Sequence, residues 1–349
     1  SFRAVYPISP YEAEGAEYLP NSRVLKLADG RLHFVPPGSP WDAYGPADHP
    51  AALAAAKADR DWLAAGVVPG DTPEQQEMAA RALLDMRTMT RPNGAAVVSW
   101  YDYWQFVWPR DASWISAAFA ATGHSSEAVS VLRFLKNAQH EDGTWDARYH
   151  PIDATPVKDG RQWQLDGNGW VPWATNFWWA TVPHTAATKR QLTELWPMVQ
   201  SAAEYAAKSL DREGLPPASP DYWEINTDKP NLGTAAPLLA GLREAAVLAD
   251  EMGRQDLVRR WTRAADRLQG AIDTHFAPNY TRTIDPDSGL DTAVTFLAPP
   301  FASYDPDVDA AIQRAEEALT IDNGGVIPGE TWPGNPTESW TAESGWFGL

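Results

Sequence analysis

The sequence predicts an all-α protein with a small β-containing extension at its N-terminus. Three observations support this. Apolar residues recur at helical spacing in most segments after residue 48, loops rich in Pro and Gly separate these segments, and residues 1–47 follow a different pattern. A helix with one apolar face must bury that face against its neighbours. A ring of antiparallel helix pairs or a helical solenoid would do so, and the absence of a fixed-period repeat favours the ring.

The N-terminal extension is expected over residues 1–47. Residues 24–36 resemble two short strands around Asp29-Gly30, a dipeptide typical of hairpin turns. Prolines and glycines follow this hairpin. The remaining residues, 48–349, are expected to form one helical domain.

The helices are expected from apolar stripes and from end signals. Thr72 is a suitable N-cap for a helix that begins at Pro73 and has Glu74 in its first turn. Residues 126–139 place their apolar side chains on one stripe. The expected helices cover residues 51–65, 73–89, 111–122, 126–139, 192–206, 238–249, 255–276, 307–319 and 338–349.

The chain is strongly acidic. Its 46 acidic and 28 basic residues among 349 give a formal net charge of −18. An acidic surface repels nucleic-acid phosphates and anionic lipids, so neither nucleic acid nor a membrane is expected as a partner. No apolar run approaches the roughly 20 residues of a membrane span. The charge is compatible with a neutral substrate.

No metal or cofactor is expected. The chain has no cysteine, which excludes disulfides and thiolate metal sites, and its seven histidines are scattered without metal-ligand spacing. Neither a phosphate-binding Gly-rich loop nor a Gly-x-Ser-x-Gly motif occurs. Metal-dependent hydrolysis, kinase chemistry and serine hydrolysis therefore have no support.

Tryptophan is unusually frequent. Twelve of the 18 tryptophans lie between Trp100 and Trp223. A buried indole must find a partner for its N–H, so a core does not need so many. Their concentration favours a carbohydrate-binding cleft, and a cluster of large core aromatics is the alternative.

The segment from Trp104 to Asp111 carries the clearest functional signal. Aromatic residues, among them Trp104 and Trp108, lead into Arg110-Asp111 at the start of an expected helix. Aromatic faces suit the C–H face of a sugar ring, while Arg donors and Asp acceptors suit vicinal hydroxyls. A buried Arg-Asp pair that caps a helix is the alternative.

Trp223-Glu224 is the second constellation, in a loop that follows a Pro-rich stretch. A glutamate beside a tryptophan, with few nearby cations, should have its acid form favoured by desolvation. A general acid needs that property to protonate a leaving oxygen. An ordinary surface carboxylate is the alternative.

Two further loops could contribute to a sugar site. Residues 163–170 place Gln164 and Asp166 between two indoles, one of them Trp170. An ordinary Asp-Gly turn is the alternative interpretation of this segment. Residues 324–336 form an aromatic and acidic loop that contains Glu330.

In this order, the motifs resemble the glucoamylases of glycoside hydrolase family 15, which also includes glucodextranases and some trehalases. The resemblance covers about residues 55–349. The family's W-x-R-D pattern is matched at 108–111, Q-x-x-D-G-[ST]-W at 139–145, Q-x-D-G at 164–167 and W-E at 223–224. An L-D-A-S-like stretch is found at 290–295 and a Y-P-x-D-T-Y-x-G-N-P-like loop at 327–336.

The resemblance implies an (α/α)6 toroid and an inverting exo-hydrolase with its site at a loop-rich rim. It implies that Arg110 and Asp111 hold hydroxyls of the terminal sugar and that Glu224 is the general acid. The other residues expected to contact substrate are Trp104, Trp108, Gln164, Asp166, Trp170, Trp223 and Glu330.

The chain departs from the family at three positions. Ile225 stands where the family has a second Glu, which affects the leaving-group site. Val326 stands where the family has an Arg that helps to bind the terminal sugar, and Ile327 replaces the adjacent Tyr. These departures make glucose itself uncertain as the sugar.

The catalytic base is not evident. In the family it is a Glu that comes later than Leu349, and inversion needs two carboxyl groups roughly 6.5–9.5 Å apart. We expect the base beyond Leu349, with a missing C-terminal segment or a second chain completing the barrel. Glu338 is the candidate base within the sequence, and Glu343 is another.

The function expected is an inverting exo-glycosidase that acts on a neutral oligo- or polysaccharide such as an α-glucan. One alternative is a trehalase-like or non-glucose exo-glycosidase, and another is a non-catalytic carbohydrate-binding protein. The compartment stays open, with secretion slightly favoured because a polymeric substrate suggests export.

Overall fold

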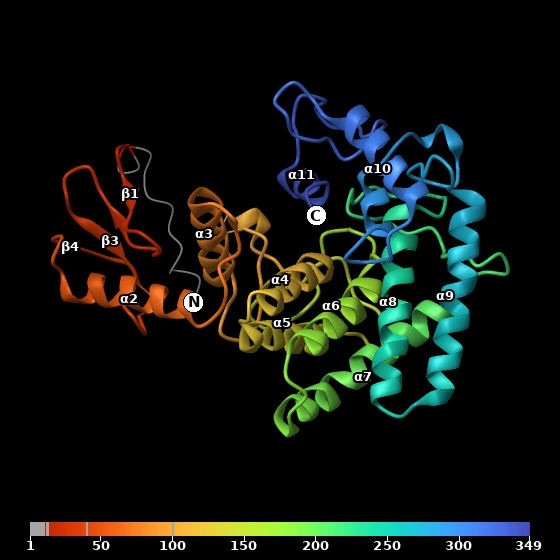
Figure 1. The fold of residues 1–349 in the computed structure, drawn as a ribbon, viewed down its shortest axis with the longest axis horizontal. Helices are drawn as coiled ribbons and strands as arrows, with labels where there is room; N and C mark the ends of the chain where they lie inside the picture. The colour runs from red at the N-terminus through yellow and green to blue at the C-terminus, as the bar shows by residue number, and fades with distance from the viewer. Residues whose placement is uncertain (1–10, 12–13, 40, 100) are drawn as a thin grey trace. The chain divides into compact units, whose positions relative to one another are not determined.

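The computed structural model describes residues 11, 14–39, 41–99 and 101–349. The chain divides into two compact units. The first comprises Ser1–Phe134, Tyr149–Thr155 and Ala180–Pro183, and the second comprises Leu135–Arg148, Pro156–Trp179 and His184–Leu349. Each is described by itself. Helices predominate among the labelled elements (Figure 1), which agrees with the predicted class. Parts of the expected N-terminal extension, residues 1–10, 12–13 and 40, and also Trp100, lie outside the described residues.

The first unit contains a small antiparallel sheet. Its strands are β1 (Glu17–Tyr18), β2 (Leu25–Lys26), β3 (Leu32–Phe34) and β4 (Ala43–Gly45), in the order β1-β2-β3-β4. The hairpin expected around Asp29-Gly30 is confirmed, because β2 pairs with β3 across this turn and Gly30 has a φ of +84°. Sequence reasoning missed β1 and β4, which are two and three residues long.

One apolar cluster joins this sheet to the first helix, α2 (Pro50–Ala64). Leu32 and Phe34 alternate toward the core along β3, and they meet Ala52 and Ala56 of the helix. Helix α3 (Pro73–Met89) begins at the predicted cap, where Thr72 and Gln75 form a capping box. The unit continues with η2 (Asp102–Trp104), α4 (Pro109–Ala121) and most of α5 (Ser125–Ala138).

The second unit is helical. Its elements are α6 (Gly167–Thr181, except for its last two residues), α7 (Ala186–Ser209), α8 (Leu232–Glu251), α9 (Gln255–His275), η3 (Pro286–Ser288), η4 (Thr292–Leu297), α10 (Pro306–Leu319) and α11 (Thr341–Trp346). Helices α8 and α9 pack side by side, and α7 packs against both (Figure 1). Helix α11 is shorter than the expected 338–349, and α7 and α8 begin six residues earlier than the expected 192 and 238.

Helix α6 was not predicted. It is buried around most of its circumference and contains Pro172, so it shows no apolar stripe and no polar face. Two glycines let it approach α8 closely. A Cβ on Gly169 would lie 2.1 Å from the Pro237 carbonyl oxygen, and one on Gly241 would lie 2.4 Å from the Gly169 carbonyl oxygen.

Helix α8 corrects the expectation about apolar runs. It is long and apolar enough to cross a membrane by length and composition, but 83% of that window is buried inside the protein. It is therefore a core helix of the second unit.

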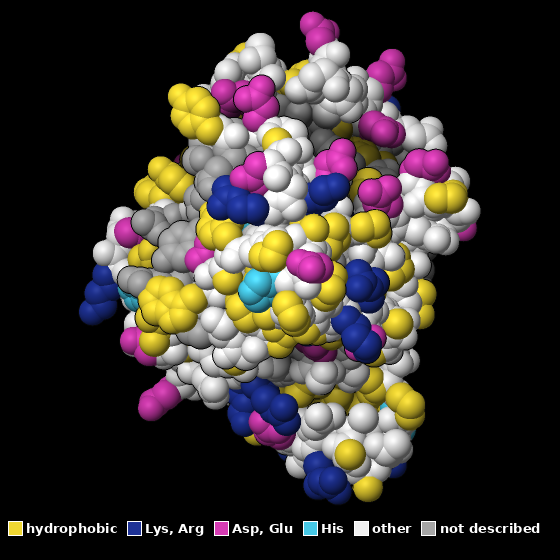
Figure 2. All heavy atoms as spheres, turned by 90° about the vertical axis from the view of Figure 1, so that its left-hand side faces the viewer, with side chains coloured by type: hydrophobic (Ala, Val, Ile, Leu, Met, Phe, Trp, Pro, Cys, Tyr) yellow, Lys and Arg dark blue, Asp and Glu magenta, His cyan; other side chains and the backbone are white. Residues whose placement is uncertain are grey.

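On the face drawn in Figure 2, acidic and basic side chains are interspersed among apolar ones.

Candidate active site

A tight loop presents Glu224. The Trp223 N–H donates to Asp221 Oδ1 at 3.0 Å, and the Glu224 N–H donates to the Asp221 carbonyl oxygen at 2.9 Å. Glu224 has a φ of +56°, in the left-handed region. A non-glycine residue in this region is strained by about 1–3 kcal/mol, and it persists only where its surroundings hold it. Such strain is a recognised feature of functional sites.

Buried charged residues hold this loop from behind. The Arg282 guanidinium carbon lies 3.8 Å from the centroid of the Trp223 ring, and Arg282 Nη2 donates to Asp221 Oδ1 at 3.1 Å. The Tyr222 hydroxyl donates to Asp291 Oδ1 at 2.6 Å. Asp221 and Asp291 are almost fully buried. The Arg282 guanidinium therefore packs on the Trp223 ring and holds it against its own loop.

This network binds protons unusually tightly. Burial raises the pKa of Asp291 to about 7, repulsion from Asp221 adds to the rise, and the Tyr222 hydrogen bond and Arg282 oppose it. Burial also raises the pKa of Asp221, against the attraction of Arg282. Burial behind the Trp223-Glu224 loop therefore favours the protonated form of Asp291 more than an exposed aspartate would allow.

Glu224 lines a cavity of about 410 Å³ in the second unit, together with Arg161, Gln164, Ile225 and Asn226. Arg161 Nε donates to Glu224 Oε2 at 2.8 Å, and Gln164 Nε2 donates to Oε1 at 3.1 Å. Both carboxyl oxygens thus accept a hydrogen bond from the protein. The side chain of Glu224 is 19% exposed, so a ligand can reach it.

Arg161 corrects the expectation of few cations near Glu224. It comes from a loop 63 residues earlier in the chain, and its guanidinium also pairs with Asp159, which pairs with Arg148. Burial alone would raise the pKa of Asp159, but the Arg161 backbone N–H and the two guanidiniums outweigh it and lower that pKa.

The loop before α6 supplies Gln164 and positions it. The Leu165 N–H donates to Ser219 Oγ at 3.0 Å, which ties this loop to the one that carries Glu224. Asp166 is 2% exposed, and its carbonyl oxygen accepts the N–H groups of Gly169 and Trp170 at the start of the helix. Gln164 therefore lines the cavity, whereas Asp166 is buried and does not line it.

The structure places Trp170 in the core rather than at the cavity wall. Its side chain is fully buried and packs against the rings of Trp173, Phe296 and Phe301, at centroid distances of 5.7, 4.9 and 5.2 Å. Most of the described tryptophans between residues 104 and 223 are buried as well, as the core interpretation expects. Trp223 is only 6% exposed.

The Trp104–Asp111 motif lies in the first unit. Trp108 is the N-cap residue of α4 and is nearly buried, while Trp104 is 41% exposed, and their rings lie 5.9 Å apart. Arg110 and Asp111 occupy the first turn of α4, with Arg110 Nε 3.7 Å from Asp111 Oδ2. The half-exposed Trp104 indole thus lies in the same segment as the Arg110–Asp111 pair, which combines hydrogen-bond donors with acceptors.

The remaining acidic candidates take part in local contacts of the second unit. Glu330 Oε2 accepts the Leu290 N–H at 2.6 Å, and its neighbour Gly329 lies against the Trp223 ring. Glu338 is exposed, and its Oε1 accepts from Asn335 Nδ2 at 2.9 Å. Glu343 is 2% exposed on α11.

Among the residues predicted, the structure brings together Glu224, Gln164 and Trp223. Arg110, Asp111, Trp104 and Trp108 belong to the other unit. Sequence reasoning missed Arg161 and Arg282, since nothing near them in the sequence signals a carboxylate partner. No group of three or more potential metal-ligating side chains occurs within the described part of the chain.

Comparisons with known proteins agree with this picture. The model of "Glycosyl hydrolases family 15" matches residues 136–321, more than half of the chain. An uncharacterized glycosyl hydrolase of Methanocaldococcus jannaschii is 25% identical over 283 residues, which cover 77% of this chain and 44% of that protein. The chain thus spans less than half the length of this curated relative.

Solved structures show the same fold. A wild-type glycosidase superposes with a TM-score of 0.65 at 17% identity, covering 78% of this chain and 77% of its own. A bacterial glucoamylase complexed with acarbose superposes with a TM-score of 0.59 at 17% identity, covering 80% of this chain and 47% of its own. The likeness confirms the predicted fold class, an (α/α)6 toroid with a small N-terminal β-containing extension.

Proposed function

The chain belongs to family 15 of the glycosyl hydrolases, and on this premise we propose that it is an inverting exo-glycosidase. It would release single sugars from the non-reducing end of a neutral oligo- or polysaccharide, with an α-glucan as the expected substrate. The observation that carries the proposal is Glu224, a strained and reachable carboxylate in a cavity of about 410 Å³. No nucleic acid or membrane is proposed as a partner.

Glu224 is proposed as the general acid that protonates the glycosidic oxygen as the bond breaks. Because Arg161 and Gln164 engage both of its oxygens, a bound substrate has to replace one of these contacts before the proton can be given. Arg161 can keep Asp159 as an acceptor when it releases Glu224. Of the two contacts, the one from Arg161 is therefore proposed to be replaced by the substrate.

Further residues are proposed to hold the sugar ring. Arg110 and Asp111 would bind hydroxyls of the terminal sugar, while Trp104 and Trp108 would stack on its C–H face. Gln164 would bind near the scissile oxygen. Glu330, Asp166 and Trp170 would act through the loops that they anchor rather than by touching the sugar.

Inversion also requires a base that activates water on the opposite face of the sugar. Within the sequence, Glu338 is the candidate for this role. It is exposed on the loop before α11 and is held by Asn335. A Glu338→Gln variant tests the assignment directly.

Two alternatives have a specific observation each. Ile225 lines the cavity where a second carboxylate would stand, which favours a non-glucose or trehalase-like exo-glycosidase. Arg161 Nε donates to Glu224 Oε2 at 2.8 Å and so occupies one oxygen of the proposed acid, which favours a carbohydrate-binding protein without turnover. These alternatives predict, respectively, release from a different sugar and binding without release.

The experiment is sugar release from maltose, isomaltose, trehalose and starch by the wild type and by Glu224→Gln. The substitution keeps the size of the side chain and removes the acid proton, so release should fall by about 10²–10⁴-fold. Glu317→Gln, an exposed change on α10, is the matched control and should retain full activity. Release that survives in Glu224→Gln would exclude this residue as the acid, and binding without release would favour the non-catalytic alternative.

A further inference from the structure

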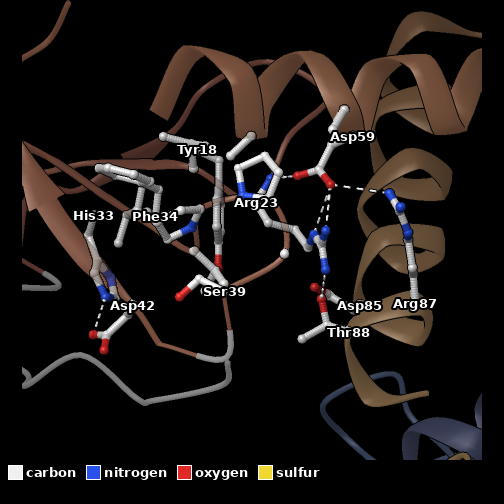
Figure 3. Close-up of a pocket in the computed structure, with 18 of the residues that line it drawn as sticks. Tyr18, Arg23, His33, Phe34, Ser39, Asp42, Asp59, Asp85, Arg87 and Thr88 are labelled. Carbon is white, nitrogen blue, oxygen red and sulfur yellow. Dashed lines mark hydrogen bonds and ion pairs between the residues drawn. The ribbon is translucent and has the colours of Figure 1, made fainter. Parts of the chain in front are cut away.

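A second and larger cavity lies within the first unit. It has a volume of about 850 Å³, within the range of about 300–1,000 Å³ that is usual for small-ligand sites. The residues that line it come from the strands β1–β3 and the loops that follow them, and from helices α2 and α3 (Figure 3). It shares no residue with the Glu224 cavity.

A buried carboxylate organises one wall of this cavity. Asp59 is 2% exposed, and it accepts from Arg23 N at 2.8 Å, from Arg23 Nη2 at 2.6 Å and from Arg87 Nη1 at 3.3 Å. Arg23 Nη1 also donates to Thr88 Oγ1 at 3.2 Å. Figure 3 shows these side chains converging from the loop before β2 and from both helices. Asp59 therefore holds the guanidinium groups of Arg23 and Arg87 in place. Arg23 remains 39% exposed.

A second wall combines an aromatic ring with one charge pair and one contact between a histidine and an aspartate. Tyr18 is 54% exposed, and the Arg81 guanidinium carbon lies 4.1 Å from the centroid of its ring. Arg81 Nη2 pairs with Asp85 at 3.2 Å, and His33 Nε2 lies 2.8 Å from Asp42 Oδ2. An exposed tyrosine offers an apolar face together with a hydroxyl that can bond to a ligand.

The charges of the lining indicate the class of ligand. Three arginines and three aspartates line the cavity, so their formal charges cancel. An anion would meet the aspartates and a cation the arginines, whereas a neutral molecule with many hydroxyls can use both as donors and acceptors. A flat aromatic ring beside paired Arg and Asp side chains is suited to the two faces of a sugar, one of C–H groups and one of hydroxyls.

We propose that this cavity is a second carbohydrate site, which binds a neutral oligosaccharide through Tyr18, Arg23 and the Arg81–Asp85 pair. It deepens the proposed function, since a polymer held there would raise the local concentration of chain ends for hydrolysis. The site is built from residues of the first unit alone.

Hydrogen–deuterium exchange of the Glu224→Gln protein, with and without maltoheptaose, tests this and reports each cavity separately. Protection of peptides that cover 17–39 and 81–89 is expected. Protection confined to 220–226 would overturn this inference and leave the proposed function intact. Protection confined to 17–39 and 81–89 would support this inference and contradict sugar binding at Glu224. No protection at 17–39 and 81–89 with maltoheptaose, isomaltoheptaose or cellohexaose would overturn it.

Variants then connect the protection to the proposed residues. In Tyr18→Ala, the maltoheptaose concentration for half-maximal protection at 17–39 should rise at least tenfold, and Asp85→Asn should raise it severalfold. Tyr11→Ala, a change at a 90% exposed tyrosine outside the lining, should leave it unchanged. Equal values for all three variants would overturn the proposal, as would protection by inorganic phosphate and not by the sugar.

Discussion

At the residue scale, Asp291 links the candidate site to pH. Its pKa is raised from 3.8 to about 7 in the folded protein, chiefly by burial. A carboxyl group with a raised folded-state pKa stabilises the protein below its unfolded pKa, and this contribution is lost as the pH rises through the folded value. Stability should therefore fall between about pH 4 and pH 7, moderated by Arg282 and Tyr222, which face the group.

An Asp291→Asn variant should flatten that part of the pH profile. The amide oxygen can still accept from the Tyr222 hydroxyl and from the Ala293 N–H, now 2.6 and 2.8 Å from Asp291 Oδ1, while the ionisable proton is gone. Urea unfolding at several pH values between 4 and 8 measures the effect, with the exposed Asp287→Asn as control. An unchanged slope in Asp291→Asn would show that another group causes the fall.

Individual site residues could be predicted from the sequence only where a single segment contained a recognisable motif. Trp223-Glu224 and Gln164 were identified from local motifs and from the family resemblance, and they do meet in space. Arg161 lies on a loop whose sequence shows no motif, so its contact with Glu224 depends on tertiary structure alone. The cluster of tryptophans was ambiguous because an indole suits both a cleft and a core.

At the element scale, the close crossing of α6 and α8 gives a sharp prediction. Gly169→Ala would put a methyl group 2.1 Å from the Pro237 carbonyl oxygen, so the two backbones must move apart. Overpacking of this kind destabilises a protein by about 1–3 kcal/mol, occasionally more. The free energy of unfolding in urea measures it.

Gly270 provides the matched control for Gly169. It lies inside α9, and a Cβ there would meet nothing within 4 Å. Gly270→Ala should therefore stabilise the protein by up to about 1 kcal/mol, because alanine favours helix over glycine. Equal effects of the two substitutions would contradict the close crossing.

Helices were predictable where one face was apolar and the ends were marked. The helix at 73–89 was expected with its cap at Thr72, and α9 was expected within a residue of its end. The first residues of α8 were missed because Leu232–Pro237 is buried and includes a glycine and a proline. Helix α6 was missed for the same physical reason, since burial on most sides removes periodicity.

At the scale of the whole molecule, each compact unit contains residues that the sequence predicted for sugar binding. Arg110 and Asp111 come from the first, and Glu224 with Gln164 from the second. The division of the sequence into 1–47 and 48–349 stays a prediction. The spacing of apolar residues correctly predicted a helical fold, and the absence of a fixed-period repeat favoured a ring over a solenoid. The (α/α)6 class itself came from the family resemblance.

The most direct measurement of the central claim compares two leaving groups. Fluoride leaves a glycosyl carbon without protonation, whereas the sugar oxygen of maltose needs an acid. If Glu224 is the general acid, Glu224→Gln should lose about 10²–10⁴-fold in kcat/KM on maltose and far less on α-glucosyl fluoride. Equal losses on both substrates would contradict the account, because they would mean that Glu224 does something other than deliver a proton.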